Sequence, residues 1–253
     1  MADVSLCIPV FNSAAFLDEM FACLRDLTPP PFEIVFLDDG SNDDSLARLS
    51  SFAATSSIAA PVRVLANERN SGIASAYNRL AREARGEWVQ LLDADDRPVE
   101  SDYFEQVQVA LTVDCDLVIT GLDSNAAPLA WLARLLGHLV PRRPPPWWPL
   151  LGSFATRAGV LYRRQRLLVL PFPDPAWPGS DVIHLLELRN SGRCTFLSKP
   201  RLFYRVHSGA ESSRSRNYVN YAHQLARFGL LTRWAYRFDL AMRRVGQRWM
   251  RRQ

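Results

Sequence analysis

Short apolar segments and helically spaced segments alternate along the first hundred residues. The apolar runs at 4–9, 33–37, 62–65 and 88–92 predict strands, and the unbroken run at 33–37 is typical of a strand buried on both faces. Between them, apolar residues three and four positions apart predict helices at 14–27 and 71–84, with Gly86 as the stop signal of the latter. A short helix is also predicted after the second strand, with Ser41 or Asn42 as its N-cap. This alternation predicts an α/β fold with a doubly wound, mostly parallel sheet flanked by helices.

The second half of the chain is less regular. Its pattern predicts a helix at 103–111, a strand at 116–120, a helix at 180–190 and a short strand at 202–204. From residue 217 onward the pattern is basic, aromatic and helical, which predicts a C-terminal basic helical tail.

Polar clusters follow three of the predicted strands. Phe11-Asn12 follows the first strand, Asp-Asp-Gly-Ser at 38–41 the second, and Asp-Ala-Asp-Asp at 93–96 the fourth. Ligands of open α/β sheets bind outside the carboxyl ends of the strands. We therefore expect these clusters to converge at one edge of the sheet and to form a ligand site.

The run at 93–96 places three carboxylates, Asp93, Asp95 and Asp96, within four residues. Such groups repel one another unless a cation neutralises them, and hard oxygen ligands select Mg²⁺ or Mn²⁺. A divalent ion held there would stabilise a departing diphosphate. A solvated acidic loop is the alternative explanation.

Two other segments suit the same edge. Asp39 can accept a hydrogen bond from a base or a ribose, and Gly40 permits a positive φ, although a helix-capping turn explains both equally well. Asn70 and Gly72 open the third predicted helix, with Asn78 inside it, and a helix N-terminus can approach a phosphate closely. An ordinary helix cap explains this second segment too.

Composition narrows the class of protein. With 253 residues and 48% hydrophobic content, the chain can bury one sizeable core. The four cysteines are far apart and form no CxxC pair, so the sequence suggests neither a zinc ribbon nor a thioredoxin-type redox site and indicates reduced thiols. No apolar run approaches the roughly 18 residues that span a bilayer. No GxG or P-loop spacing is present.

Charge is unevenly placed along the chain. The net charge is only +4, but residues 201–253 hold 12 arginines against two acids. Basic helices with aromatic residues suit an anionic membrane surface, and a helix packed on the main domain with a solvated arginine face is the alternative. No nucleic-acid-binding motif supports a nucleic-acid partner. We expect a cytoplasmic protein, peripheral on the inner face of the cell membrane.

The order and spacing of four segments resemble the family 2 glycosyltransferases with the GT-A fold. These segments are residues 8–12, 37–41, 70–74 and 91–96, and the resemblance extends over about 4–213. It implies an inverting transfer of a sugar from a nucleotide-diphosphate donor, UDP being the favoured nucleotide, with Mn²⁺ or Mg²⁺. It also implies a GT-A catalytic domain at 1–213, with a nucleotide-binding half at about 1–100 and an acceptor half at about 101–213, followed by the tail at 214–253.

The resemblance also implies roles for individual residues. Asp39 would recognise the base, and Asp93 and Asp95 would hold the ribose and the metal-bound diphosphate. Arg205 would neutralise phosphate charge. The implied metal ligands are Asp95, Asp96 and His207. The implied donor-binding residues are Pro9, Phe11, Asn12, Asp39, Asn70, Gly72, Asn78, Asp93, Ala94, Asp95 and Arg205.

Asp181 matches the family's general base. It lies at the start of a predicted helix, where the helix dipole stabilises its anion, and an acceptor hydroxyl needs a carboxylate within reach. Two residues depart from the family pattern. Ser180 stands where the family usually has glutamate, and Tyr77 where many relatives have a donor-contacting arginine.

The acceptor implied is a bacterial surface glycan, free or lipid-linked. Two alternatives stay open. One is a catalytically inactive relative that binds nucleotide-sugar, since Ser180 replaces the glutamate. The other is a haloacid-dehalogenase-like phosphatase, suggested by Asp93-Ala94-Asp95 after a strand. Arg97 stands where that motif needs Thr or Val, and Lys199 is the sole lysine of the chain.

Overall fold

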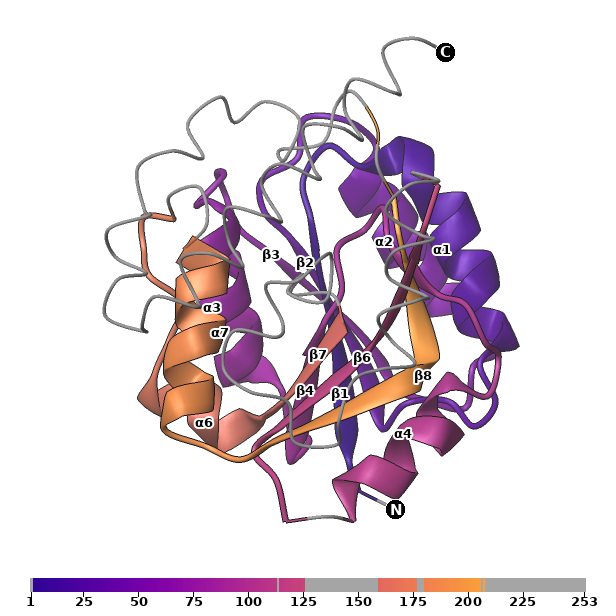
Figure 1. The fold of residues 1–253 in the computed structure, drawn as a ribbon. Coiled ribbons are helices and arrows are strands. Elements are labelled where there is room, and N and C mark those ends of the chain that lie inside the picture. The colour runs from indigo at the N-terminus through magenta and orange to yellow at the C-terminus, as the bar shows by residue number, and fades with distance from the viewer. Residues whose placement is uncertain (1, 113, 126–158, 177–179, 206, 208–253) are drawn as a thin grey trace, which may run out of the picture.

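The protein folds into one mixed sheet covered by helices on both faces (Figure 1). This computed structural model describes residues 2–112, 114–125, 159–176, 180–205 and 207. The strands are β1 (Val4–Val10), β2 (Glu33–Asp38), β3 (Val62–Ala66), β4 (Trp88–Leu91), β5 (Arg97–Pro98), β6 (Leu117–Ser124), β7 (Val160–Arg163) and β8 (Cys194–Tyr204). The helices are α1 (Ala14–Asp26), α2 (Ser45–Thr55), α3 (Ile73–Glu83), α4 (Tyr103–Leu111), α6 (Arg164–Val169) and α7 (Ser180–Asn190).

The order of the strands explains how the sheet gathers its polar ends. Across the sheet the order is β3-β2-β1-β4-β7-β6-β8-β5. The first four strands are all parallel, so β1, β2 and β4 finish at the same edge, as predicted. β7 is antiparallel to both β4 and β6, β8 runs parallel to β6, and β5 is antiparallel to β8. The predicted doubly wound, mostly parallel sheet is confirmed.

Each face of the sheet supports its own hydrophobic core. Helices α1, α2 and α4 cover one face, and α3, α6 and α7 cover the other (Figure 1). Leu6 and Ile8 of β1 belong to the first core, and Cys7 between them belongs to the second. β2 is buried along its whole length, which confirms the prediction made for 33–37.

Several predicted boundaries were wrong, because contacts distant in sequence decided them. α2 begins at Ser45 after Asp44, not after Ser41 or Asn42. The Ser41 hydroxyl accepts a hydrogen bond from the Asn12 amide, and the Asn42 amide donates to Asn12 Oδ1. These two residues therefore join the ends of β1 and β2 instead of capping a helix.

Gly86 and β8 are two further corrections. α3 already ends at Glu83, three residues before Gly86. A Cβ at Gly86 would lie 2.7 Å from the Asp3 carbonyl oxygen, so this glycine permits a close approach to β1. β8 spans 11 residues instead of the three predicted at 202–204, because it pairs with β6 at both its ends.

Gly40 joins two loops at the edge where the parallel strands finish. Its φ is 72°, as its sequence context predicts, and a Cβ there would lie 2.6–2.7 Å from main-chain atoms of Arg69 and Asn70. Gly40→Ala is expected to lower the free energy of unfolding by about 2 kcal/mol or more, since backbone strain and overlap add together. Urea denaturation measures the change. An unchanged midpoint would show that the two loops separate without cost.

The predicted tail at 214–253 lies outside the described residues, and so does 126–158 of the predicted acceptor half. Among the residues that are described, none of the helices has both the length and the apolar character needed to cross a bilayer.

Candidate functional site

Three carboxylates meet in the turn that follows β4. Each of Asp93, Asp95 and Asp96 offers an oxygen, and these oxygens lie within 4.8 Å of one another. The Asp96 amide donates to the Asp93 carbonyl at 3.0 Å, which closes the turn. Burial, followed by the charge of Asp93, raises the pKa of Asp95, although its hydrogen bond with His207 works in the opposite direction. The repulsion by Asp93 is the part of this raised pKa that a bound cation would relieve.

The segment after β8 reaches this carboxylate cluster from the far end of the chain. His207 Nε2 lies 2.9 Å from Asp95 Oδ2. The Arg205 amide donates to Asp96 Oδ1 at 2.9 Å, and Arg205 Nε donates to the Asp95 carbonyl at 2.9 Å. Residues about 110 positions apart are thereby joined in one site. This contact brings the His207 imidazole to the carboxylate cluster, and its predicted role as a metal ligand stays a prediction.

Helix α1 supports the same segment. Glu19 forms ion pairs with both Arg205 and Arg97, and the Phe16 ring lies 5.0 Å from the His207 ring. The Arg205 guanidinium is thus engaged by Glu19 and by the main chain of Asp95. The structure gives Arg205 the task of anchoring its own segment, and its predicted contact with the donor stays a prediction.

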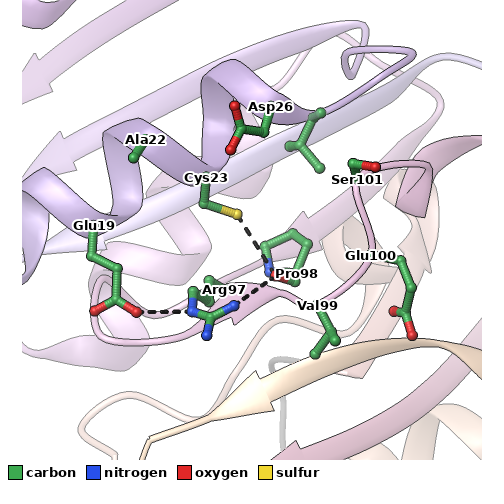
Figure 2. A pocket seen from close by; sticks show the side chains of 10 residues that line it. Glu19, Ala22, Cys23, Asp26, Arg97, Pro98, Val99, Glu100 and Ser101 are labelled. Carbon is green, nitrogen blue, oxygen red and sulfur yellow. Dashed lines mark hydrogen bonds and ion pairs between the residues drawn. The ribbon is translucent and has the colours of Figure 1, made fainter.

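A pocket of about 270 Å³ opens between α1 and β5, beside this anchor and not over the carboxylate cluster. Figure 2 shows Glu19 and Cys23 of α1 facing Arg97 and Pro98 of β5. Cys23 Sγ lies 3.7 Å from the Pro98 carbonyl, and burial raises the pKa of this thiol to about 11. A thiol with that pKa is a poor nucleophile near neutral pH, so the pocket lacks an activated cysteine.

Asp39 orders the loop before α3. Its carboxylate accepts hydrogen bonds from Asn67 Nδ2 at 2.5 Å, from the amide and hydroxyl of Ser71, and from the Gly72 amide at 3.1 Å. These donors use most of the acceptor capacity of a carboxylate. A base would have to share or displace them, so base recognition by Asp39 stays a prediction.

The other residues predicted to bind the donor occupy the same edge in different ways. Asn12 adopts a left-handed φ of 49°, and the Asn70 side chain accepts from the Gly72 amide. The Phe11 side chain is 43% exposed, so its ring is available to a ligand. Pro9 is buried within β1, and the Ala94 side chain is buried in a hydrophobic core. These two buried residues can meet a ligand only through their main chain.

The side-chain amide of Asn78 binds a loop that is distant in sequence. Its Nδ2 donates to the Phe172 carbonyl at 2.9 Å, and its Oδ1 accepts from the Phe172 amide at 2.8 Å. The side chain therefore fixes the main chain of a distant loop. The structure shows this bridging role for Asn78, and its predicted contact with the donor stays a prediction.

Asp181 lies in the first turn of α7, half-buried. Beyond the other end of α7, the Arg193 amide donates to Asp116, next to the start of β6. Leu117 at the start of β6 pairs with Tyr162 of β7, and Tyr162 pairs in turn with Val89 near the start of β4. The last turn of α7 therefore lies toward the edge where β4 begins. An 11-residue helix is about 16 Å long, so its first turn lies toward the edge where β4 finishes (Figure 1).

The fold is that of the GT-A glycosyltransferases. The mannosyltransferase PcManGT from Pyrobaculum calidifontis, solved with GDP-Man and Mn²⁺, matches with a TM-score of 0.70 at 18% identity, over 96% of this chain and 76% of that one. TarS of S. aureus, solved with UDP-GlcNAc, matches with a TM-score of 0.65 at 18% identity, over 84% and 61%. The chain belongs to glycosyl transferase family 2, whose sequence profile matches residues 5–167.

Relatives in sequence agree with this assignment. The glycosyltransferase GlyG of Streptococcus pneumoniae is 31% identical over 116 residues, which is 46% of this chain and 38% of its own. TuaG of Bacillus subtilis, named for teichuronic acid biosynthesis, is 27% identical over 118 residues, or 47% and 46%. The chain therefore spans less than half the length of these two relatives.

Sequence reasoning missed three sets of contacts around the site. These are the ion pairs of Glu19, the hydrogen bonds of Phe172 with Asn78, and the hydrogen bond that the Tyr77 hydroxyl donates to Asp93 Oδ1. Glu19 lies on an amphipathic helix, where an acidic residue reads as solvated surface. Phe172 lies in a loop without periodicity. Tyr77 was visible only as a departure from the family pattern, and its position in α3 does not reveal its partner.

Proposed function

We propose that this protein transfers a sugar from a nucleotide-diphosphate donor, with UDP the favoured nucleotide, to an acceptor hydroxyl, with inversion at the anomeric carbon. The observation that carries the proposal is the meeting of Asp93, Asp95, Asp96 and His207 at the carboxyl edge of a family 2 sheet. That edge is where α/β proteins bind nucleotides.

The donor site fits a divalent cation. Asp95, Asp96 and His207 would hold Mn²⁺ or Mg²⁺, which supplies positive charge to the leaving diphosphate. The raised pKa of Asp95 supports this fit, because burial and then the charge of Asp93 disfavour its anion, which a bound cation would stabilise. Asp93 and the exposed Phe11 ring would orient the nucleoside at the same edge.

The acceptor step falls to Asp181. Its carboxylate would accept the proton of the acceptor hydroxyl as that oxygen attacks the anomeric carbon. The bond between that carbon and the diphosphate oxygen breaks at the same time, and the nucleoside diphosphate leaves with the bonding electrons. Attack opposite to the leaving group inverts the anomeric centre. The position of Asp181 in the first turn of α7 supports this assignment.

The names of relatives and neighbours support the choice of substrates. TarS was solved with UDP-GlcNAc and PcManGT with GDP-Man, so UDP and GDP are the nucleotides to compare. TuaG is named for teichuronic acid biosynthesis, which supports a bacterial surface glycan as acceptor, free or lipid-linked. We propose that the chain works in the cytoplasm at the inner face of the membrane, with the ten arginines of the basic tail at 214–253 as the attachment.

A thermal-shift screen tests the donor assignment. UDP with Mn²⁺ is expected to raise the melting temperature more than UDP or Mn²⁺ alone, because a ligand of the folded state stabilises it. The same measurement with GDP and Mn²⁺ shows whether the site prefers uracil or guanine, because the preferred nucleotide raises the melting temperature more. Equal melting temperatures under all conditions would contradict a nucleotide site.

Turnover separates the remaining alternatives. Slow Mn²⁺-dependent hydrolysis of UDP-sugars would support the transferase and exclude an inactive relative. Membership of family 2 already speaks against the phosphatase alternative. Release of phosphate from p-nitrophenyl phosphate would overturn the proposed function.

A further inference from the structure

A buried tyrosine hydroxyl holds one of the three carboxylates. Tyr77 of α3 is 1% exposed, and its hydroxyl donates a hydrogen bond to Asp93 Oδ1. A hydroxyl buried to this degree needs a partner, and a bond to an ionised carboxylate is among the stronger kinds. α3 approaches the donor edge from the face of the sheet that also carries α7 (Figure 1).

The Tyr77 ring is fixed by a loop 95 positions away in sequence. The Phe172 ring lies 5.3 Å from the Tyr77 ring and 4.0 Å from the His184 ring of α7. Phe172 belongs to neither a helix nor a strand, yet it is 5% exposed. The two hydrogen bonds of Asn78 hold its main chain, and Asn78 directly follows Tyr77 on α3. Neighbouring residues of one helix therefore fix both the phenylalanine and the tyrosine that packs on it.

This arrangement acts on Asp93. Its carboxylate is repelled by Asp95 and Asp96, so an unanchored Asp93 would rotate away from them. The Tyr77 hydroxyl opposes that rotation and fixes where Asp93 presents its second oxygen. The anchor is a neutral donor, so it adds no charge that would compete with a cation.

We propose that Tyr77 is a positioning residue for the nucleotide-sugar donor, holding Asp93 in the orientation in which its carboxylate meets the donor. The inference rests on the proposed function of this edge. It extends that function by assigning the holding of Asp93 to Tyr77, a position where the chain departs from its family. Asn78 and Phe172 would support Tyr77 in this role.

Tyr77→Phe tests the inference, because it removes the hydroxyl and keeps the ring packed on Phe172. UDP binding in the presence of Mn²⁺, measured by calorimetry, is expected to weaken about 10-fold, because Asp93 would then hold the binding orientation only part of the time. The matched control is Tyr103→Phe. Tyr103 is also fully buried, and its hydroxyl bonds with Gln90 and Thr120 on the opposite face of the sheet. This control is expected to change thermal stability and to leave UDP affinity unchanged.

A double-mutant cycle with Asp93→Asn separates positioning from a general structural effect. If Tyr77 acts through Asp93, Tyr77→Phe will weaken UDP binding less than about twofold in the Asp93→Asn background. An equal loss in both backgrounds would overturn the inference, and so would wild-type affinity in the single variant. If the wild-type protein binds neither UDP nor GDP with Mn²⁺, the proposed function itself fails, and that result is distinct from wild-type binding that is insensitive to Tyr77→Phe.

Discussion

Asp95→Asn is expected to remove the Mn²⁺-dependent rise in melting temperature and to lower UDP-sugar hydrolysis by about 100- to 1000-fold. Asp95 belongs to the carboxylate cluster and also contacts His207. Replacing it removes a ligand and a negative charge from the centre of the cluster. Thermal shift with and without Mn²⁺, together with a UDP-release assay, measures both effects.

Without Mn²⁺, Asp95→Asn is expected to affect the melting temperature in the opposite direction. Burial and Asp93 raise the pKa of Asp95, so the ionised carboxylate destabilises the metal-free fold. Asp95→Asn should therefore melt at the same temperature as the wild type or higher when Mn²⁺ is absent. Asp18→Asn is the control, since Asp18 is an exposed residue of α1 that pairs with Arg48 of α2. This variant should change neither the melting temperature without Mn²⁺ nor its rise with Mn²⁺. A full Mn²⁺ response in Asp95→Asn would place the cation elsewhere.

Asp181→Asn is expected to lower the turnover of the UDP-sugar by about 100- to 10,000-fold, the usual contribution of a general base. Binding of UDP with Mn²⁺ should be unchanged, because Asp181 belongs to α7 and not to the turn after β4. Comparing turnover at saturating donor with the calorimetric affinity for UDP separates the two effects.

Glu187→Gln is the matched control for this variant. It removes a carboxylate from the same helix, six residues further along, and should leave both turnover and affinity intact. If Asp181→Asn turns over donor at the wild-type rate, the general base is a different residue, while membership of the family stands. If Asp181→Asn also loses UDP binding, α7 contributes to the donor site directly.

Site residues that directly follow a predicted strand could be predicted from the sequence, whereas contacts between distant segments could not. The carboxylates at 93–96 were predictable because a mostly apolar, buried strand ends shortly before them. Gly40 was predictable because its place after the second strand calls for a tight turn, and its φ of 72° confirms this. The contact between His207 and Asp95 could be suggested only by family resemblance, since 112 positions separate the two residues.

Other contacts had no sequence signal. The prediction that Ser41 or Asn42 caps a helix was wrong, because local preference favours a cap while the real partner is Asn12 in the loop after β1. Asn78 read as a ligand for a phosphate or base, yet its amide pairs with the main chain of Phe172, 94 positions away. A planar amide suits both tasks equally well, so only the fold distinguishes them.

The sequence by itself determined the alternation of strands and helices, because hydrophobic period is a local property. It also placed the polar clusters after β1, β2 and β4 at one edge, because strands joined by helical crossovers run parallel. The tertiary structure alone decided which side chains those clusters meet. Tyr77 and Asp93, Arg205 and Asp96, and Asp39 and the loop before α3 become neighbours only when the sheet forms. Contacts between distant segments depend on the packing of the whole chain, which no local pattern encodes.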